Sequence, residues 1–318
     1  MLAILTITGP IYLVILIGFL TTRLGLFTRA DMRVIGKFVV NLALPALIFN
    51  AMAQRPLREI FNLSYLLAYL AGSLGVITVG YVWCRRHDHL DSTTSAVHVM
   101  GMSCSNSGFV GYPIVLLALA PVAGVSLALN MMVENIVVIP LMLALAERGR
   151  GGAASWHRQV RQSAVRLAAN PIILGLASGL LVSLIGWQLP QALARTINMF
   201  AMASGALSLF VIGGALVGLP MQGMGRKVMP IVLGKLLIHP ALVLLALLAL
   251  PVLGLPALDP SLRTAAILMA AMPMMGIYPI LAQAYGQESF SSAALLVTTV
   301  CSFFTLSTLL WLMPYLRF

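Results

Sequence analysis

The sequence predicts an all-α protein that crosses a lipid bilayer many times, and three observations support this fold class. Hydrophobic residues make up 60% of the 318 residues and charged residues only 8%, whereas a soluble domain carries roughly 25% charged residues. The mean hydropathy is +1.01. The apolar runs are continuous and about twenty residues long, which is the length of a transmembrane helix, and they lack the alternation of a membrane β-barrel.

Ten apolar segments follow one another along the chain, and each can span about 30 Å of hydrocarbon as a helix. They cover residues 4–22, 34–53, 63–84, 93–120, 122–146, 169–187, 197–219, 228–250, 262–286 and 289–313. Because no basic stretch precedes the first run, we interpret 4–22 as a membrane helix and not as a cleaved signal peptide. We therefore expect a multi-pass membrane protein.

Basic residues in the loops predict the orientation of these segments. With the N-terminus outside, the connections on the cytoplasmic side hold thirteen arginines and lysines, and those on the opposite side hold five. The positive-inside rule then places both termini outside the cytoplasm. The net charge of +11 lies in these loops, so it does not indicate binding of nucleic acid.

The longest polar connection, residues 147–168, is a basic linker that divides the chain into two halves of five segments, 1–146 and 169–318. The tetrapeptide GYPI begins at Gly111 in the fourth segment, and IYPI begins at Ile277 in the ninth. These are equivalent positions in the two halves. Because each half has an odd number of helices, the second half is inserted upside down, which is the inverted-repeat plan of secondary transporters.

Residues that break helices interrupt the fourth and ninth segments. The fourth contains SCSNSGFVGYPIV, in which Asn106, Ser107 and Gly108 are expected to end a helix and Pro113 to restart it. The ninth contains AAMPMMGIYPI, with Pro273 and further breakers. A break within the bilayer is tolerated only where it lines a cavity or is buried in protein.

A helix that restarts near the membrane midplane presents free N–H groups and the positive end of its dipole, which favour an anion. We therefore predict a substrate site for a small anion where the two breaks meet. The candidate binding residues are Ser105, Asn106, Ser107, Gly108, Pro113, Asn41, Pro273, Gly276, Tyr278 and Pro279. The alternative is a pair of proline kinks whose freed backbone groups are satisfied by neighbouring helices.

A second candidate site would couple transport to an ion. Glu134 is the only acid deep within a segment, and a charge there costs about 2.5–3.5 kcal/mol unless it is paired. Lys235 and His239 are four residues apart, so they share a helix face and are its candidate partners. The alternatives are a buried structural pair, or a Lys235 side chain that reaches the membrane surface. His98 is either a proton relay or a hydrogen-bonded core histidine.

The motif NSGFVGYPI, its partner IYPI, the two sets of five segments and the basic linker resemble the auxin efflux carrier family. The resemblance covers the whole chain. It implies broken, crossing fourth and ninth helices and a panel domain and a core domain that move as an elevator. It also implies a protein of the bacterial inner membrane. Bacterial members are regarded as permeases for carboxylates such as malonate or malate. In plant members, which export auxin, both crossovers carry an asparagine, whereas here Met272 lies opposite Asn106.

We therefore predict a secondary active transporter of a small organic anion, such as malonate, malate or an auxin-like acid. It has no cofactor or metal, and H⁺ or Na⁺ would be the coupling ion. The sequence shows no catalytic, metal-ligand or Walker pattern, so we expect no enzyme activity. The alternatives are an ion-coupled carrier of a larger, bile-acid-like anion, or an intramembrane enzyme or receptor. Apolar faces of 34–53 and 197–219 could form a homodimer.

Overall fold

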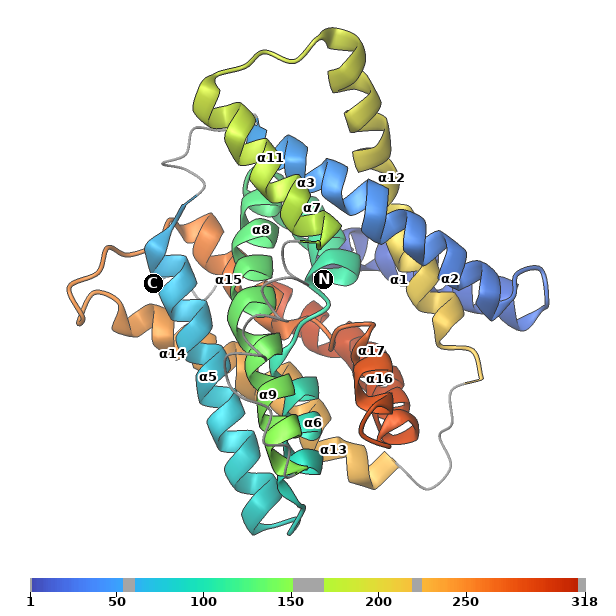
Figure 1. Cartoon of the computed structure of the whole chain (residues 1–318), viewed down its shortest axis with the longest axis vertical. Helices are drawn as coiled ribbons and strands as arrows, with labels where there is room; N and C mark the ends of the chain where they lie inside the picture. The colour runs from blue at the N-terminus through green and yellow to red at the C-terminus, as the bar shows by residue number, and fades with distance from the viewer. Residues whose placement is uncertain (1, 54–60, 151–168, 219–224, 314–318) are drawn as a thin grey trace.

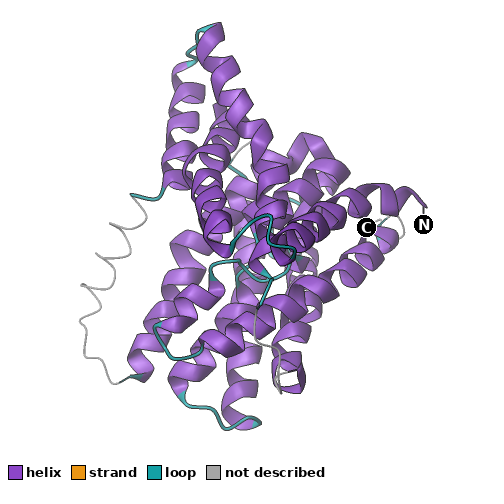
Figure 2. Cartoon of the chain, turned by 90° about the vertical axis from the view of Figure 1, so that its right-hand side faces the viewer, coloured by secondary structure: helices purple, strands orange, loops and turns teal. Residues whose placement is uncertain are grey.

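The computed structural model describes residues 2–53, 61–150, 169–218 and 225–313. Throughout these residues the regular structure is helical, as Figure 2 shows, and the one strand-like feature in them is an isolated antiparallel bridge between Ser105 and Met274. The predicted all-α class is therefore confirmed for the described residues.

The helices of the first half are α1 Leu2–Arg23, α2 Arg29–Phe38, η1 Val39–Ala43, α3 Leu44–Ala53, α5 Leu63–Arg86, α6 Ser92–Ser103, η2 Ser107–Gly111, α7 Tyr112–Leu119, η3 Ala120–Val122, α8 Ala123–Val133, η4 Glu134–Val138 and α9 Ile139–Gly149. Those of the second half are α11 Pro171–Ile185, α12 Gln191–Ala215, α13 Gly225–Leu233, η5 Gly234–Ile238, α14 His239–Ala249, α15 Pro260–Ala271, α16 Tyr278–Gln283 and α17 Glu288–Leu312. Elements η1, η2, η4 and η5 are single wide turns of π-helix within longer helices.

Helices lie on all ten predicted apolar segments. By length and composition, six helices of the described residues can cross a membrane, and two apolar helices are shorter. One of the six, Ser107–Gly149, is folded back on itself near Leu119, whose φ and ψ of −146° and 52° are not helical. As a result α7 and α8 pack on each other instead of forming one straight helix.

The helices pack in two groups (Figure 1). The first group contains α1, α2, α3, α11 and α12, in which α12 packs on α1 and α3, and α3 packs on α11. It lies toward the top and right of Figure 1. The second group contains α5 to α9 and α13 to α17, with α5 against α14 and α6 against α9. The groups meet where α12 contacts η2, α3 contacts α8, and α1 contacts α7 and α17.

Close approach between helices of the first group depends on glycine. A Cβ atom added at Gly175 of α11 would lie 2.6 Å from the carbonyl oxygen of Pro45, and one at Gly213 of α12 would overlap the carbonyl oxygen of Ile15. Small residues allow such backbone contact where hydrocarbon provides no hydrophobic driving force. The first group is thus held together by tight backbone packing.

An aspartate begins each helix that leads into a break. The carboxylate of Asp91 accepts from the N–H groups of Thr93 and Thr94 at 2.9 and 3.1 Å, at the start of α6. Asp259 does the same at the start of α15, accepting from Ser261 and Leu262 at 2.8 and 3.3 Å. These caps satisfy N–H groups that have no acceptor within the helix.

Of the predicted linker 147–168, residues 151–168 lie outside the described part of the chain. The described part begins at Glu147 in the last turn of α9 and ends at Arg150.

Candidate functional site

The two broken segments cross in the second group of helices and pair through their backbones. The N–H of Asn106 donates to the carbonyl of Pro273 at 2.8 Å, and the N–H of Met275 donates to the carbonyl of Cys104 at 3.1 Å. These bonds form the antiparallel bridge between Ser105 and Met274. Each break therefore satisfies polar groups of the other, as buried backbone within a membrane requires.

The first break restarts earlier than the sequence predicts. A helical turn begins at Ser107, and Pro113 follows as the second residue of α7. Because η2 runs directly into α7 with helical backbone at Gly111, Pro113 lies inside a continuous helix, just after a wide π-type turn. The carbonyl of Asn106 accepts from both Val110 and Gly111, at 3.1 and 2.9 Å, so the restart is a wide π-type turn.

The second break restarts at Tyr278, with Pro279 as the second residue of α16. This helix has only six residues, whereas η2 and α7 continue to Leu119. The two restarts are therefore unequal, and the positive helix end at the first break is the better developed one.

Glu134 lies against the first break and is held by three donors. Its Oε1 accepts from the N–H of Ser105 at 2.8 Å and from the hydroxyl of Tyr69 at 3.1 Å. Its Oε2 accepts from the hydroxyl of Ser107 at 3.3 Å. A carboxylate of the protein thus occupies one side of the crossover.

Lys235 is fully buried on the other side of Ser105. Its ammonium donates to Ser105 Oγ at 2.7 Å and to the carbonyl of Ala270 at 2.6 Å, and it contacts His239 Nδ1 at 2.9 Å. The alternative that this lysine reaches the membrane surface is therefore wrong. Glu134 and Lys235 are joined through Ser105.

The hydroxyl groups in this network form a chain with a definite direction. Tyr69 gives its single proton to Glu134, so Ser105 must donate to Tyr69, which lies 3.1 Å away, and must accept from Lys235. On the far side, His239 Nε2 lies 3.1 Å from Ser73 Oγ. The chain connects the buried ammonium to the buried carboxylate without a gap. Asn130 joins the chain by donating to Ser107 Oγ. The crossover network comprises Tyr69, Ser73, Ser105, Ser107, Asn130, Glu134, Lys235 and His239.

The side chain of Asn106 faces away from this network. It is buried, and its Nδ2 has no hydrogen-bond partner within the described residues. A Cβ added at Gly276 would lie 3.8 Å from that Nδ2 and 3.5 Å from Cδ1 of Ile212 on α12. Gly276 itself is exposed. The amide therefore lies where the crossover meets α12 of the first group.

A cavity of about 430 Å³ lies farther along α12, between α3, α7, α8 and α12, and its lining does not include Asn106. Its polar lining includes Asn50, Asn198 and Ser204. Pro113, a predicted site residue, packs next to it against Gly205. The cavity is thus bounded by both groups of helices, so movement of one group against the other would change its shape.

The remaining predicted site residues are distributed unevenly. Ser107, Gly108 and Pro273 are buried at the crossover. Tyr278 is buried against Gly101, and its hydroxyl has no partner within the described residues. Asn41 is exposed and donates to the carbonyl of Lys37 on its own helix, so it does not turn toward the crossover.

Within the described residues His98 has no hydrogen bond to the crossover network. It is buried, hydrogen-bonds the side chain of Gln287, and stacks on Phe290 with ring centroids 4.0 Å apart. Its Nε2 lacks a hydrogen-bond partner within the described residues. The observed contacts fit a hydrogen-bonded core histidine, and they give no support to a proton relay to the crossover network.

Sequence reasoning missed Tyr69, Ser73 and Asn130. Asn130 donates to Ser107 Oγ at 2.5 Å and lies one helical turn before Glu134. Tyr69 and Ser73 are four residues apart on one face of α5 and lie within its largely apolar middle. This i, i+4 spacing of polar residues was the available signal.

Comparison with known proteins identifies the family. A family model described as membrane transport protein matches residues 4–312. The chain belongs to this family. It is the auxin efflux carrier family that the crossover motifs indicated.

Two relatives agree with this assignment. A protein of Rhizobium meliloti (strain 1021) described as "Putative malonate transporter" is 30% identical over 317 residues, covering 96% of this chain and 95% of that protein. The "Uncharacterized transporter YfdV" of Escherichia coli (strain K12) is 24% identical over 211 residues, covering 64% of this chain and 66% of that protein. The chain is therefore a multi-pass membrane transporter and not an enzyme.

Proposed function

We propose that this protein is a secondary active transporter of a small organic anion that binds at the crossover beside Asn106. The observation that carries the proposal is the buried amide of Asn106, whose Nδ2 has no hydrogen-bond partner within the described residues. An unsatisfied buried donor costs about 1–3 kcal/mol. A carboxylate that accepted its hydrogen bond would recover that free energy.

The anion would occupy the side of the crossover that faces α12. The opposite side is already occupied, because Glu134 accepts the N–H of Ser105. Lys235 is joined to the same serine, so the formal charges of Glu134 and Lys235 cancel and the network does not repel an anion. The substrate would therefore meet the amide of Asn106 and the positive end of η2 and α7.

A small carboxylate fits this place better than a larger apolar anion. The cavity of about 430 Å³ between α3, α7, α8 and α12, which does not include Asn106 in its lining, falls within the size range of small-molecule sites, roughly 300–1,000 Å³. Met272, Met274 and Met275 are buried, so Ile277 is the large apolar side chain that the second break exposes. The malonate named for the Rhizobium relative, malate and auxin-like acids are the first candidates.

The arrangement of helices supports ten transmembrane segments in two inverted repeats, 1–146 and 169–318, joined by the linker 147–168. The first group of helices contains the first two segments of each half, and the second group contains the last three. The aspartate caps of α6 and α15 occupy equivalent positions. In this proposal the second group moves against the first as an elevator, in the plasma membrane of a bacterium, with both termini outside. A homodimer through the apolar faces of 34–53 and 197–219 stays a prediction; Met199 and Met202 are exposed on the second of these faces.

We favour H⁺ over Na⁺ as the coupling ion. The ammonium of Lys235 already provides a cation for the only carboxylate in the crossover network. The directed chain from Lys235 through Ser105 and Tyr69 to Glu134 is suited to moving a proton. An interior-negative potential of 100 mV drives a monovalent anion outward by about 2.3 kcal/mol. Export therefore needs no coupling ion, whereas uptake does.

Thermal unfolding of the purified protein tests the anion site. We expect malonate or another carboxylate to raise the unfolding midpoint, because a ligand of the native state stabilises it by mass action. Asn106→Ala should abolish that rise, and without ligand it should leave the protein equally or more stable. Asn41→Ala is the matched control, because Asn41 bonds its own helix. Repeating the titration at two pH values, with and without Na⁺, separates the two coupling ions.

Two outcomes would contradict the proposal. A midpoint shift of equal size in the wild type and in Asn106→Ala would place the anion elsewhere. A shift with cationic or neutral ligands and with no carboxylate would overturn the anion assignment itself.

A further inference from the structure

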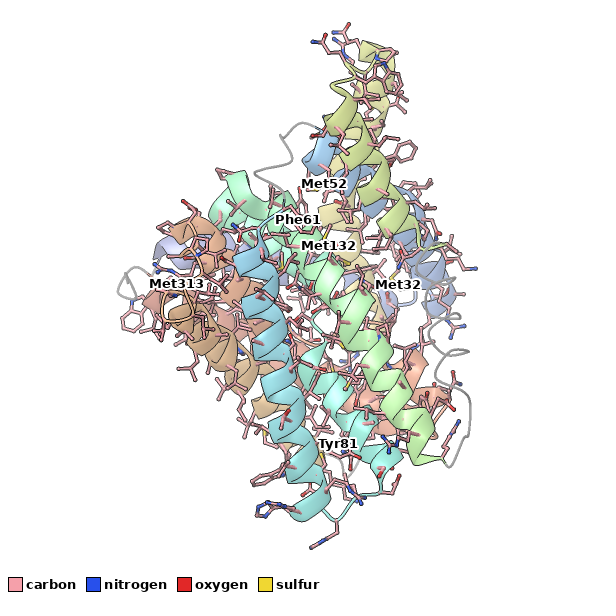
Figure 3. The ribbon with its side chains drawn as sticks, turned by 60° about the vertical axis from the view of Figure 1, so that its left-hand side comes forward. Met32, Met52, Phe61, Tyr81, Met132 and Met313 are labelled. Carbon is pink, nitrogen blue, oxygen red and sulfur yellow. The ribbon has the colours of Figure 1, made fainter. Side chains whose placement is uncertain are left out.

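We propose that the cavity between α5, α6 and α9 binds an anionic phospholipid. This second cavity has a volume of about 580 Å³ and lies away from the crossover, where α5 and α9 end and α6 begins. Ile77, Val82 and Leu145 form its apolar wall, and Tyr81, Ser92 and Arg148 are among the polar residues of its lining. Figure 3 labels Tyr81 near the lower end of α5.

Glycine packing fixes the position of the charge in this cavity. A Cβ added at Gly149 would lie 2.5 Å from Thr93 Oγ1 and 2.6 Å from the N–H nitrogen of Thr93. The end of α9 therefore lies directly on the first turn of α6, and Thr93 Oγ1 also donates to the carbonyl of Ala146 at 3.0 Å. This contact holds Arg148 beside Ser92.

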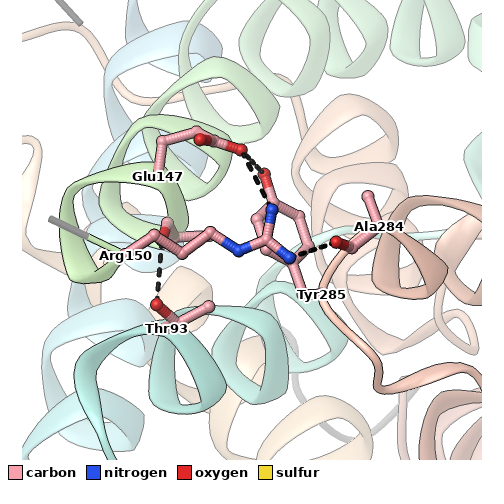
Figure 4. A network of polar contacts seen from close by, with 6 residues as sticks. Thr93, Glu147, Arg150, Ala284 and Tyr285 are labelled. Carbon is pink, nitrogen blue, oxygen red and sulfur yellow. Dashed lines mark hydrogen bonds and ion pairs between the residues drawn. The ribbon is translucent and has the colours of Figure 1, made fainter. Parts of the chain in front are cut away.

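The two arginines at the end of α9 have different environments. Arg150 is engaged in the network of Figure 4: it donates to the carbonyl of Ala284, lies 4.6 Å from the ring centre of Tyr285, and pairs with Glu147 at 4.0 Å. Arg148 is exposed, and within the described residues its guanidinium has no hydrogen bond or ion pair with the protein. Its five N–H donors are free to bind a phosphate.

The charges around the cavity favour an anion. Arg85 and Arg86 occupy the last turn of α5, and the guanidinium of Arg85 donates to the carbonyl of Leu90 at 2.6 Å. The nearby acids are Asp88, Asp91 and Glu147. The Asp91 carboxylate is bonded to N–H groups of α6, and the Glu147 carboxylate accepts from the Tyr285 hydroxyl and pairs with Arg150. Basic pockets between membrane helices are typical sites for anionic lipid headgroups.

The shape of the lining favours a lipid over a soluble anion. Val82 is 43% exposed and Ile77 is 6% exposed, so the apolar wall runs from the surface of α5 into the cavity. An acyl chain can lie along that wall while the phosphate binds Arg148 at the rim. Tyrosine at such a boundary is common, because its ring is apolar and its hydroxyl is polar.

Competition binding tests this inference. The purified protein in detergent would be titrated with a fluorescent phosphatidylglycerol and then challenged with unlabelled phosphatidylglycerol, phosphatidylcholine or inorganic phosphate. We expect phosphatidylglycerol to compete and the other two to compete poorly. Arg148→Gln should weaken binding about fivefold, since one arginine near a lipid surface contributes on the order of that factor. Arg33→Gln, an exposed arginine on α2, is the matched control.

A second variant keeps the test valid if Arg148→Gln folds poorly. Leu145→Trp fills the apolar part of the cavity without changing charge, and it should also weaken binding. Equal affinity of the wild type, Arg148→Gln and Leu145→Trp would overturn the proposal. Competition by inorganic phosphate as strong as that by phosphatidylglycerol would also overturn it, since the site would then bind a free anion. Neither result depends on transport, so both are separable from the anion site at Asn106.

Discussion

The two broken segments pair through their backbones but differ in their chemistry. The first contributes Ser105, Asn106 and Ser107, which contact Glu134 and Lys235 or face α12. The second contributes Pro273 and buried methionines, and its described part bonds the first through backbone groups. Both follow an aspartate-capped helix, but only the second restarts beside a proline, since the first restarts at Ser107, before Pro113.

This difference separates a structural property of the repeat, the backbone pairing of the two breaks, from a functional one, the polar network. Backbone pairing at the crossover needs both breaks, because neither could be buried alone. A polar network needs only one of them. The inverted halves can therefore share a fold while one half carries the charged groups.

The largest loss of unfolding free energy is expected from removing the charge of Glu134, which lies against the first break. Glu134→Gln keeps the shape of the side chain but leaves Lys235 without a counter-charge, which should cost about 3–5 kcal/mol of unfolding free energy. The double variant with Lys235→Met should recover most of that loss. A double-mutant cycle of unfolding free energies measures the coupling.

The pair Glu147 and Arg150 serves as the comparison, because it is half-exposed and 4.0 Å apart. Glu147→Gln should cost less than about 1 kcal/mol. Additive losses from Glu134→Gln and Lys235→Met would show that the two buried groups are not coupled.

An intermediate effect is expected from making the second break polar. Met272 is fully buried, and a Cβ added at Gly111 would lie 3.3 Å from its Cγ. Met272→Asn would bury an amide without a partner and should destabilise the protein by about 1–3 kcal/mol. Thermal unfolding with and without a carboxylate measures this. A destabilisation that the carboxylate reverses would mean that the second break can also take part in anion binding, whereas no destabilisation would contradict the contrast between the breaks.

The smallest effects are expected at the two aspartate caps, where the breaks should behave alike. Asp91→Ala and Asp259→Ala should each cost about 1 kcal/mol at neutral pH. The Thr94 side chain, together with backbone N–H groups, holds the pKa of Asp91 below its ordinary value. The stabilisation by Asp91 is therefore present above its unfolded pKa of about 3.9 and is lost as the pH falls through the lower native pKa.

Unfolding midpoints of the wild type and Asp91→Ala should accordingly differ at pH 7 and converge at acidic pH. A difference that persists below the native pKa would mean that Asp91 acts through packing and not through its charge.

Much of the candidate site was predictable because breaks and buried charges stand out in an apolar sequence. Asn106, Ser107 and Pro273 interrupt long hydrophobic runs, and Glu134, Lys235 and His239 are the rare polar groups within them. Asn41 has the same kind of signal, yet it bonds its own helix. Composition reveals that a polar residue lies in the membrane, but the direction of its side chain depends on the rotation of the helix.

The sequence by itself determined the class, the ten apolar segments and the positions of the two breaks, because burial in hydrocarbon restricts composition at every residue. Only the tertiary structure decided which groups meet. It showed Ser105 between Glu134 and Lys235 and left the amide of Asn106 without a partner. These contacts join residues up to 130 positions apart, and they depend on how helices from both halves pack. A local sequence pattern cannot predict which residues so far apart in the chain will be in contact.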